Sequence, residues 1–155
     1  ETQAAALAAN AGFRESVRDA VEGGLPVFAE CAGLMYLGRE LRLGGESFPM
    51  VGALPLAFEL SPQPQGHGYT ILAVRQPNPY FPVGRVLTGH EFHYSRPVVL
   101  DGAKLEFAFS VQRGTGFEGS SDGLLYRNVL ATYTHFHALG VGDWAETLLR
   151  RAALT

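Results

Sequence analysis

The sequence predicts one α/β domain over residues 1–155, with a helical first part and a β-rich second half. Residues 3–22 repeat apolar side chains at helical spacing, with charged residues between them. Residues 25–29 form a short, continuous apolar run after a glycine pair, which is typical of a buried parallel strand. From residue 48 onward, glycine, proline and β-forming residues dominate, which favours mostly antiparallel strands in the second half.

Composition excludes several classes of partner. Hydrophobic residues make up 46% of the chain, enough for a core, and the net charge of −3 gives no electrostatic case for nucleic acid or an anionic membrane. No apolar run approaches the roughly 20 residues of a membrane span, and the first ten residues lack the features of a signal peptide. The single cysteine cannot form an internal disulfide, which fits a cytoplasmic protein.

The first part of the chain divides at its glycines. Residues 3–22 are expected to form one helix, or two short helices broken near Gly12. Residues 32–41 return to helical spacing directly after the apolar run, and Gly44-Gly45 should end this helix. The order helix, strand, sharp turn and helix is therefore predicted.

The second half alternates strand patterns with turn residues. The expected strands are 51–60, 68–75, 85–94 and 105–113. Prolines mark loops within 62–68 and 76–84, because proline removes a donor from a strand ladder. Residues 120–123 carry a turn signal, residues 124–133 a hairpin, and residues 143–154 a closing helix.

The only cysteine stands where the predicted strand meets the second helical segment. Cys31 is followed by Ala32 and Gly33, an arrangement that resembles a nucleophile elbow, where small neighbours avoid clashes in a strained turn. A helix N-terminus would lower the pKa of the thiol and offer N–H groups to an oxyanion. The alternative is an inert core cysteine, because buried cysteines commonly act as small hydrophobic residues.

A thiol nucleophile needs a base, and four of the five histidines form two tight clusters. These clusters are Gly89–Ser95 (GHEFHYS) and Tyr133–His137 (YTHFH). A metal site built from these imidazoles is a second interpretation, since imidazole is a common transition-metal ligand. No metal is predicted, because no cysteine or carboxylate stands beside them at a familiar ligand spacing.

Four motifs occur in one order along the chain: AECAGLMYLG, MVGALP, GHEFHYS and DGLLYRNVLATYTHFH. Together they resemble the C-terminal glutamine amidotransferase domain of cobyrinic acid a,c-diamide synthases, in the cobalamin-type branch of class I amidotransferases. The resemblance runs from the first residues to the last helix, and Glu1 resembles the end of the family's Gly-Gly-Tyr-Pro loop. It therefore implies a flavodoxin-like class I domain, truncated at its N-terminus, that is part of a longer protein.

The resemblance also implies a reaction and its residues. Cys31 would attack the side-chain amide of glutamine, His135 would be the general base with His137 as the neighbouring candidate, and the Ala32 N–H would stabilise the oxyanion. Glu91 and His93 would orient the base or line the glutamine pocket, or they would simply close the β-rich half through hydrogen bonds.

One position departs from the usual class I triad, which adds a glutamate two residues after the histidine. His137 stands there instead, so another group must orient the base, and a Cys-His dyad is expected rather than a triad.

The chemistry of a complete synthase extends beyond this chain. The resemblance implies an N-terminal synthetase domain, fused or separate, that binds ATP, Mg²⁺ and the corrinoid and captures the ammonia. No phosphate-binding G-x-x-x-x-G-K-[ST] motif occurs in residues 1–155, so no cofactor is expected on this domain. The alternatives are a related amidotransferase for cobyric acid or another tetrapyrrole, and a non-catalytic binding domain on the same fold.

Overall fold

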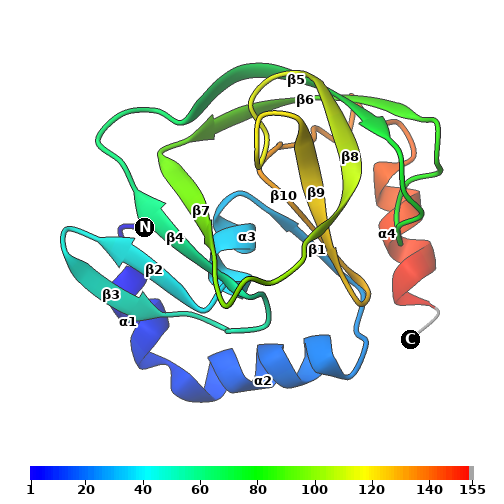
Figure 1. Ribbon diagram of the computed structural model, residues 1–155. Helices are drawn as coiled ribbons and strands as arrows, with labels where there is room; N and C mark the ends of the chain where they lie inside the picture. Colours follow the sequence, from blue (N-terminus) through cyan, green and yellow to red (C-terminus); the bar gives the residue numbers. More distant parts are fainter. Residues whose placement is uncertain (154–155) are drawn as a thin grey trace.

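The computed structural model describes residues 1–153 and contains helices on both sides of a strand-rich centre (Figure 1). The described helices are α1 (Ala4–Ala9), α2 (Ala11–Glu22), α3 (Ala32–Leu37) and α4 (Trp144–Ala152). The described strands are β1 (Val27–Glu30), β2 (Glu40–Leu43), β3 (Glu46–Pro49), β4 (Leu56–Leu60), β5 (Gly66–Val74), β6 (Val86–His93), β7 (Ser95–Val99), β8 (Glu106–Arg113), β9 (Ser121–Tyr126) and β10 (Val129–Thr132).

These strands form two sheets. One has six strands in the order β1-β10-β9-β8-β5-β6, and the other has four in the order β3-β2-β4-β7. Only the β1–β10 and β2–β4 pairings among them are parallel, whereas the others are antiparallel. The chain passes from the long hairpin of β5 and β6 directly into β7, so the two sheets are continuous in sequence and meet around α3 (Figure 1).

Two clusters of buried side chains make up the core. The larger packs α3 between the four-stranded sheet and the end of β10, with Leu34, Phe58 and Tyr133 fully buried. The smaller lies beneath α4, where Phe28 contacts the rings of Tyr80, Phe81, Phe136 and Trp144. Because β1 and β10 contribute to both clusters, their ends are held from both sides.

The predicted α/β class, a parallel first strand and the β-rich second half are confirmed. The expected burial of the first strand is wrong for most of its length, because β1 lies at the edge of its sheet and only Ala29 is buried. The first helical region is indeed divided, but the break falls at Asn10 rather than at Gly12. The Asn10 side chain accepts a hydrogen bond from the Phe13 N–H and caps α2, which is the usual role of asparagine before a helix.

The predicted helix over residues 32–41 is wrong beyond Leu37. Gly38 is extended, and the Arg39 N–H donates to the Leu56 carbonyl oxygen, so the chain enters a sheet instead. A side chain at Gly38 would lie 2.8 Å from the Phe58 ring, so the close approach to β4 requires glycine. Long-range pairing thus overrides the helical spacing of the leucines.

Several strand limits also differ from the prediction. Strands β2, β3 and β7 were not predicted, and only 56–60 of the expected strand 51–60 is extended in a ladder. Residues 121–123 belong to β9 rather than to a turn. The closing helix is confirmed over Trp144–Ala152, and Leu154, its expected end, lies outside the described residues.

Candidate active site

Cys31 occupies the sharp turn between β1 and α3. Its φ of 45° and ψ of −100° are unusual for a residue other than glycine, and such a conformation costs on the order of 1–3 kcal/mol. The Cys31 N–H donates to the Thr132 carbonyl oxygen at 2.8 Å, and the Cys31 carbonyl oxygen accepts from the Met35 N–H at 3.0 Å. The strained turn is therefore fixed by the neighbouring strand on one side and by the first turn of α3 on the other.

The residues after Cys31 are small because the turn is crowded. A side-chain carbon added at Gly33 would lie 3.4 Å from the Ala29 Cβ. The Ala32 N–H hydrogen-bonds to the thiol, and this contact favours the thiolate. The Ala32 N–H thus lies beside the sulfur. If the sulfur attacked a carbonyl carbon, the carbonyl oxygen would become an oxyanion close to this N–H.

The expected lowering of the Cys31 pKa is wrong for this chain. Burial is the main cause that raises it, to about 11, and the charge of Glu1 adds to this rise. The hydrogen bond from Ala32 acts in the opposite direction but does not prevail, and Glu30 adds a smaller rise. The sequence indicated the donor at the helix N-terminus, but it could not show how far the thiol is removed from water.

His135 lies just beyond the end of β10, the parallel neighbour of β1. The register pairs Glu30 with Thr132, so the chain passes the carboxyl ends of both strands at the same edge of the sheet. Functional groups in α/β sheets commonly gather at this edge. The parallel pair therefore brings the segment that carries His135 to the strand end that carries Cys31.

Two groups hold His135. Its backbone forms an isolated bridge with His90. The His90 N–H donates to the His135 carbonyl oxygen at 3.1 Å, and the His135 N–H donates to the His90 carbonyl oxygen at 2.8 Å. The two imidazole rings stack with centroids 5.1 Å apart. On the other side, the His135 Nδ1 atom lies 3.6 Å from the Glu30 Oε2 atom.

His137, the neighbouring candidate, has a different environment. Its side chain is exposed, and its Nδ1 atom accepts a hydrogen bond from the Leu139 N–H at 3.2 Å. This ring therefore caps the turn that follows the His135 segment.

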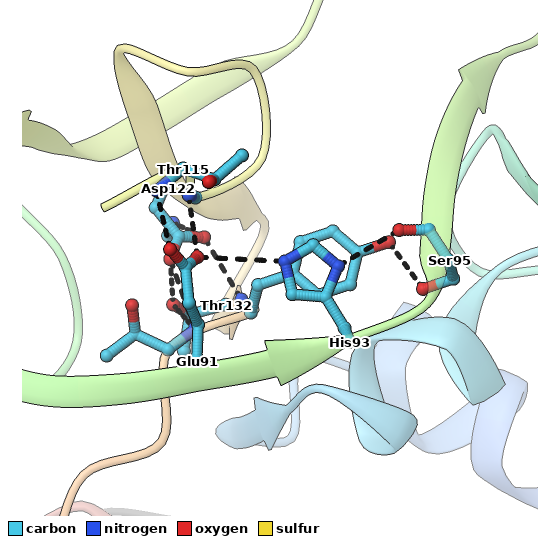
Figure 2. A network of polar contacts seen from close by, with 10 residues as sticks. Glu91, His93, Ser95, Thr115, Asp122 and Thr132 are labelled. Carbon is cyan, nitrogen blue, oxygen red and sulfur yellow. Dashed lines mark hydrogen bonds and ion pairs between the residues drawn. The ribbon is translucent and has the colours of Figure 1, made fainter. Parts of the chain in front are cut away.

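Glu91 and His93 are buried on β6 (Figure 2). Glu91 accepts hydrogen bonds from the N–H groups of Thr115 at 2.6 Å and Gly116 at 2.9 Å, and its Oε2 atom lies 3.6 Å from the His93 Nε2 atom. These contacts attach the segment Gly114–Gly116, which follows β8, to β6. The polar contacts of both side chains lie within the β-rich half.

The His93 ring continues this network toward the end of β10. It stacks on the Tyr133 ring with centroids 3.8 Å apart, and its Nδ1 atom lies 3.0 Å from the Ser95 carbonyl oxygen. The Ser95 hydroxyl is 2.8 Å from the Tyr133 hydroxyl. The GHEFHYS motif therefore packs directly against the segment that leads to His135.

The sequence does not single out Asp122, because the serine and glycine residues around it indicate a turn. The side chain is fully buried and accepts hydrogen bonds from the Thr132 hydroxyl at 2.7 Å, the Tyr133 N–H at 3.1 Å and the Thr134 N–H at 3.2 Å (Figure 2). Burial raises the pKa of Asp122, and these hydrogen bonds oppose the rise. Asp122 thus fixes the three residues before His135.

Within residues 1–153, no group of three or more histidine, cysteine, aspartate or glutamate side chains is arranged to hold a metal ion. None of the helices described there is both long and apolar enough to cross a membrane.

A thiol at a strand-to-helix elbow, with an imidazole beyond the adjoining strand, defines the class of Cys-His acyl-transfer domains. The family of CobB/CobQ-like glutamine amidotransferase domains matches residues 1–142. The chain belongs to this family, which confirms the predicted resemblance to glutamine amidotransferase domains.

Relatives carry a more specific name. The chain is 40% identical over 144 residues to a cobyrinate a,c-diamide synthase of Magnetococcus marinus, covering 93% of this chain and 31% of that protein. It is 39% identical over 152 residues to a protein of the same name from Archaeoglobus fulgidus, covering 98% of this chain and 33% of the relative. The chain therefore spans about a third of the length of these relatives.

Solved structures support the fold. A crystal structure of a glutamine amidotransferase is similar with a TM-score of 0.56 and 25% identity, over 83% of this chain and 61% of that chain. A glutamine amidotransferase from Thermotoga maritima has a TM-score of 0.53 and 12% identity, over 90% of this chain and 53% of its own. The second likeness concerns the fold alone.

Proposed function

We propose that this chain is the glutaminase half of an ATP-dependent corrinoid a,c-diamide synthase. The observation that carries the proposal is the strained Cys31 elbow beside the strand end from which His135 continues. In the proposed reaction, the Cys31 sulfur attacks the side-chain carbonyl carbon of glutamine while His135 accepts the thiol proton. His135 then returns this proton to the leaving nitrogen, and ammonia departs from the thioester. Water, deprotonated by His135, attacks the thioester, and glutamate and the free thiol are released.

The raised pKa of Cys31 gives His135 a larger task in this scheme. With a pKa of about 11, the resting thiol is almost entirely protonated near neutral pH. Proton transfer to the imidazole must therefore accompany the attack. This coupling predicts that the Cys31 thiol reacts slowly until glutamine binds and orders the site.

The oxyanion site needs a second donor beside the Ala32 N–H. Glu1 and Ala32 line the same small cavity of about 40 Å³, so the start of the described chain lies close to the elbow. We propose that the Gly-rich loop that precedes Glu1 in the family supplies this donor.

The amide acceptor belongs to the rest of the synthase in this proposal. The name of the relatives and their threefold greater length support an N-terminal synthetase domain, fused or separate, that binds ATP and Mg²⁺ and activates two corrinoid carboxylates. Ammonia from this chain would displace the activated oxygen. Because the reaction consumes ATP and glutamine, we place it in the cytoplasm.

Two alternatives stay distinguishable. A related amidation of cobyric acid or another tetrapyrrole would keep the glutaminase site but change the acceptor. A non-catalytic binding domain would keep the fold and lose the reactivity of the thiol toward glutamine analogues.

The test uses the full-length protein and 6-diazo-5-oxo-norleucine, an alkylating glutamine mimic. We expect an adduct on Cys31, located by mass spectrometry, that is absent in Cys31→Ala and strongly slowed in His135→Ala. Turnover of glutamine with ATP, Mg²⁺ and cobyrinic acid or cobyric acid then identifies the acceptor.

The absence of an adduct in folded protein would contradict the glutaminase proposal. If His137→Ala rather than His135→Ala slowed labelling, the reaction would stand and the assignment of the base would be wrong.

A further inference from the structure

We infer that Glu30 is a positioning residue for His135 and takes the place of the missing third member of the triad. The inference rests on the proposed role of His135 as base and deepens it. It concerns a residue adjacent to the nucleophile in sequence, whereas the usual third member follows the base.

The carboxylate of Glu30 makes two contacts with the His135 segment. Its Oε1 atom accepts a hydrogen bond from the Phe136 N–H at 3.0 Å, and its Oε2 atom lies 3.6 Å from the His135 Nδ1 atom. One carboxylate therefore fixes the backbone just after the base and faces the ring of the base. Side-chain exposure is 23% for Glu30 and 33% for His135, so the pair is partly shielded from water.

The orientation of these contacts matches what a general base requires. A carboxylate at Nδ1 holds the proton on that nitrogen, which leaves Nε2 with its lone pair free to accept a proton from a thiol. Once the ring is protonated, the nearby negative charge stabilises the imidazolium. A separation of 3.6 Å is longer than a hydrogen bond, and such contacts commonly tighten when substrate binds.

No competing carboxylate is present in the part of the chain that the structure describes. Within residues 1–153, Glu30 on β1 is the one acidic side chain within ion-pair distance of the His135 ring, and His90 on β6 is the titratable ring stacked on it. His137 stands where the triad glutamate is usual, but it caps the following turn. Strand pairing explains the replacement, since Glu30 and Thr132 are partners across β1 and β10.

Glu30→Gln in the full-length protein tests this role, because glutamine can still accept from the Phe136 N–H but carries no charge. We expect kcat for glutamine hydrolysis to fall roughly 10- to 100-fold, a part of the about 10²–10⁴ that base catalysis supplies, with KM little changed. The urea unfolding midpoint should stay near that of the wild type, because the change removes the charge but keeps the hydrogen bond to the Phe136 N–H.

Glu59→Gln is the matched control. Glu59 is a similarly shielded, ion-paired carboxylate on β4 of the other sheet, with 31% side-chain exposure, and this variant should keep the wild-type kcat and KM. Glu30→Asp retains the carboxylate, so it should recover part of the kcat that Glu30→Gln loses.

The outcomes separate the two proposals. Wild-type kcat in Glu30→Gln would overturn the role of Glu30, provided that Cys31→Ala and His135→Ala are inactive. Activity in either of those two variants would instead overturn the proposed function. If Glu30→Gln does not fold, a kcat in Glu30→Asp as low as that of Glu30→Ala would overturn the role.

Discussion

The proposed nucleophile and the proposed base are held in different ways. Cys31 is fixed within a few residues, by its strained backbone and by the first turn of α3, with one hydrogen bond to β10. His135 lies on an irregular segment that depends on distant partners. Its neighbours are held by Asp122 from β9, the stacked ring of His93 from β6 and the Glu30 carboxylate from β1.

This difference has a physical reason. A sharp turn between a strand and a helix is specified by local sterics, so small residues after Cys31 suffice. A segment without its own repeating hydrogen bonds must satisfy its buried N–H groups with side chains. Variants on the nucleophile side should therefore change chemistry more than stability, and variants on the base side should change both.

The largest effect is expected at the nucleophile. Cys31→Ala should reduce glutamine turnover by at least about 10⁴-fold while the protein stays folded. Cys31→Gly should be at least as stable as Cys31→Ala in urea unfolding, because glycine tolerates a φ of 45°. At most sites glycine is the less stable residue, so a clearly less stable glycine variant would contradict strain at the elbow.

The next effect concerns the base side. Asp122→Ala would remove the acceptor of four buried donors, of which the Thr134 N–H keeps another acceptor, the Thr132 hydroxyl. The change should lower the unfolding free energy by about 3 kcal/mol or more. Glutaminase activity should fall at temperatures at which the variant is still folded. Asp19→Ala, an exposed change on α2, is the control and should alter stability by less than about 0.5 kcal/mol. If Asp122→Ala and Asp19→Ala were equally stable, the proposed dependence of the His135 segment on distant partners would be wrong.

A pH experiment examines the thiol itself. With its pKa at about 11, Cys31 should react with iodoacetamide at a rate that rises about tenfold per pH unit between pH 7 and 9. At neutral pH it should carry roughly 300-fold less thiolate than a free cysteine of pKa about 8.5. Rates are measured by mass spectrometry on folded protein without glutamine. A plateau near pH 7 would mean that the helix N-terminus prevails over burial.

The smallest effect is expected at an exposed ion pair. Arg96 donates to the Glu59 Oε2 atom at 2.7 Å, and its side chain is 66% exposed, so Arg96→Ala should cost less than about 1 kcal/mol. The Glu59 pKa is lowered chiefly by Arg96, so this stability is present above the unfolded pKa and is lost as pH falls through the folded pKa. Urea unfolding at pH 7 and pH 3.5 should show a smaller acid loss in the variant. If the variant loses as much stability between pH 7 and pH 3.5 as the wild type, other groups cause that loss.

Local patterns in the sequence were sufficient for the nucleophile side. The apolar run before Cys31 and the small residues after it predict the strand, the turn and the helix that the structure contains. The pattern could not predict where α3 ends, because Gly38 leaves the helix to pair with β4. It also could not predict the direction of the thiol pKa, since burial depends on the whole core.

The base side was accessible only through the family resemblance. Spacing of the histidines left His135 and His137 equivalent, and the contacts of Glu30 arise from the parallel pairing of β1 with β10. Asp122 stands in a serine-, aspartate- and glycine-rich stretch whose local signal is that of a turn. Buried hydrogen bonds between strands produce no periodic pattern in the sequence, so the polar network could not be derived from the spacing of residues.

The burial of Cys31 has a consequence for the protein at rest. Peroxides and other cellular oxidants attack the thiolate far faster than the thiol, and the first product, a sulfenic acid, can proceed to irreversible forms. A thiol that is 8% exposed and protonated near neutral pH is shielded from this damage. In the proposed reaction, the same environment that keeps the Cys31 thiol protonated until glutamine binds would therefore also preserve it between turnovers.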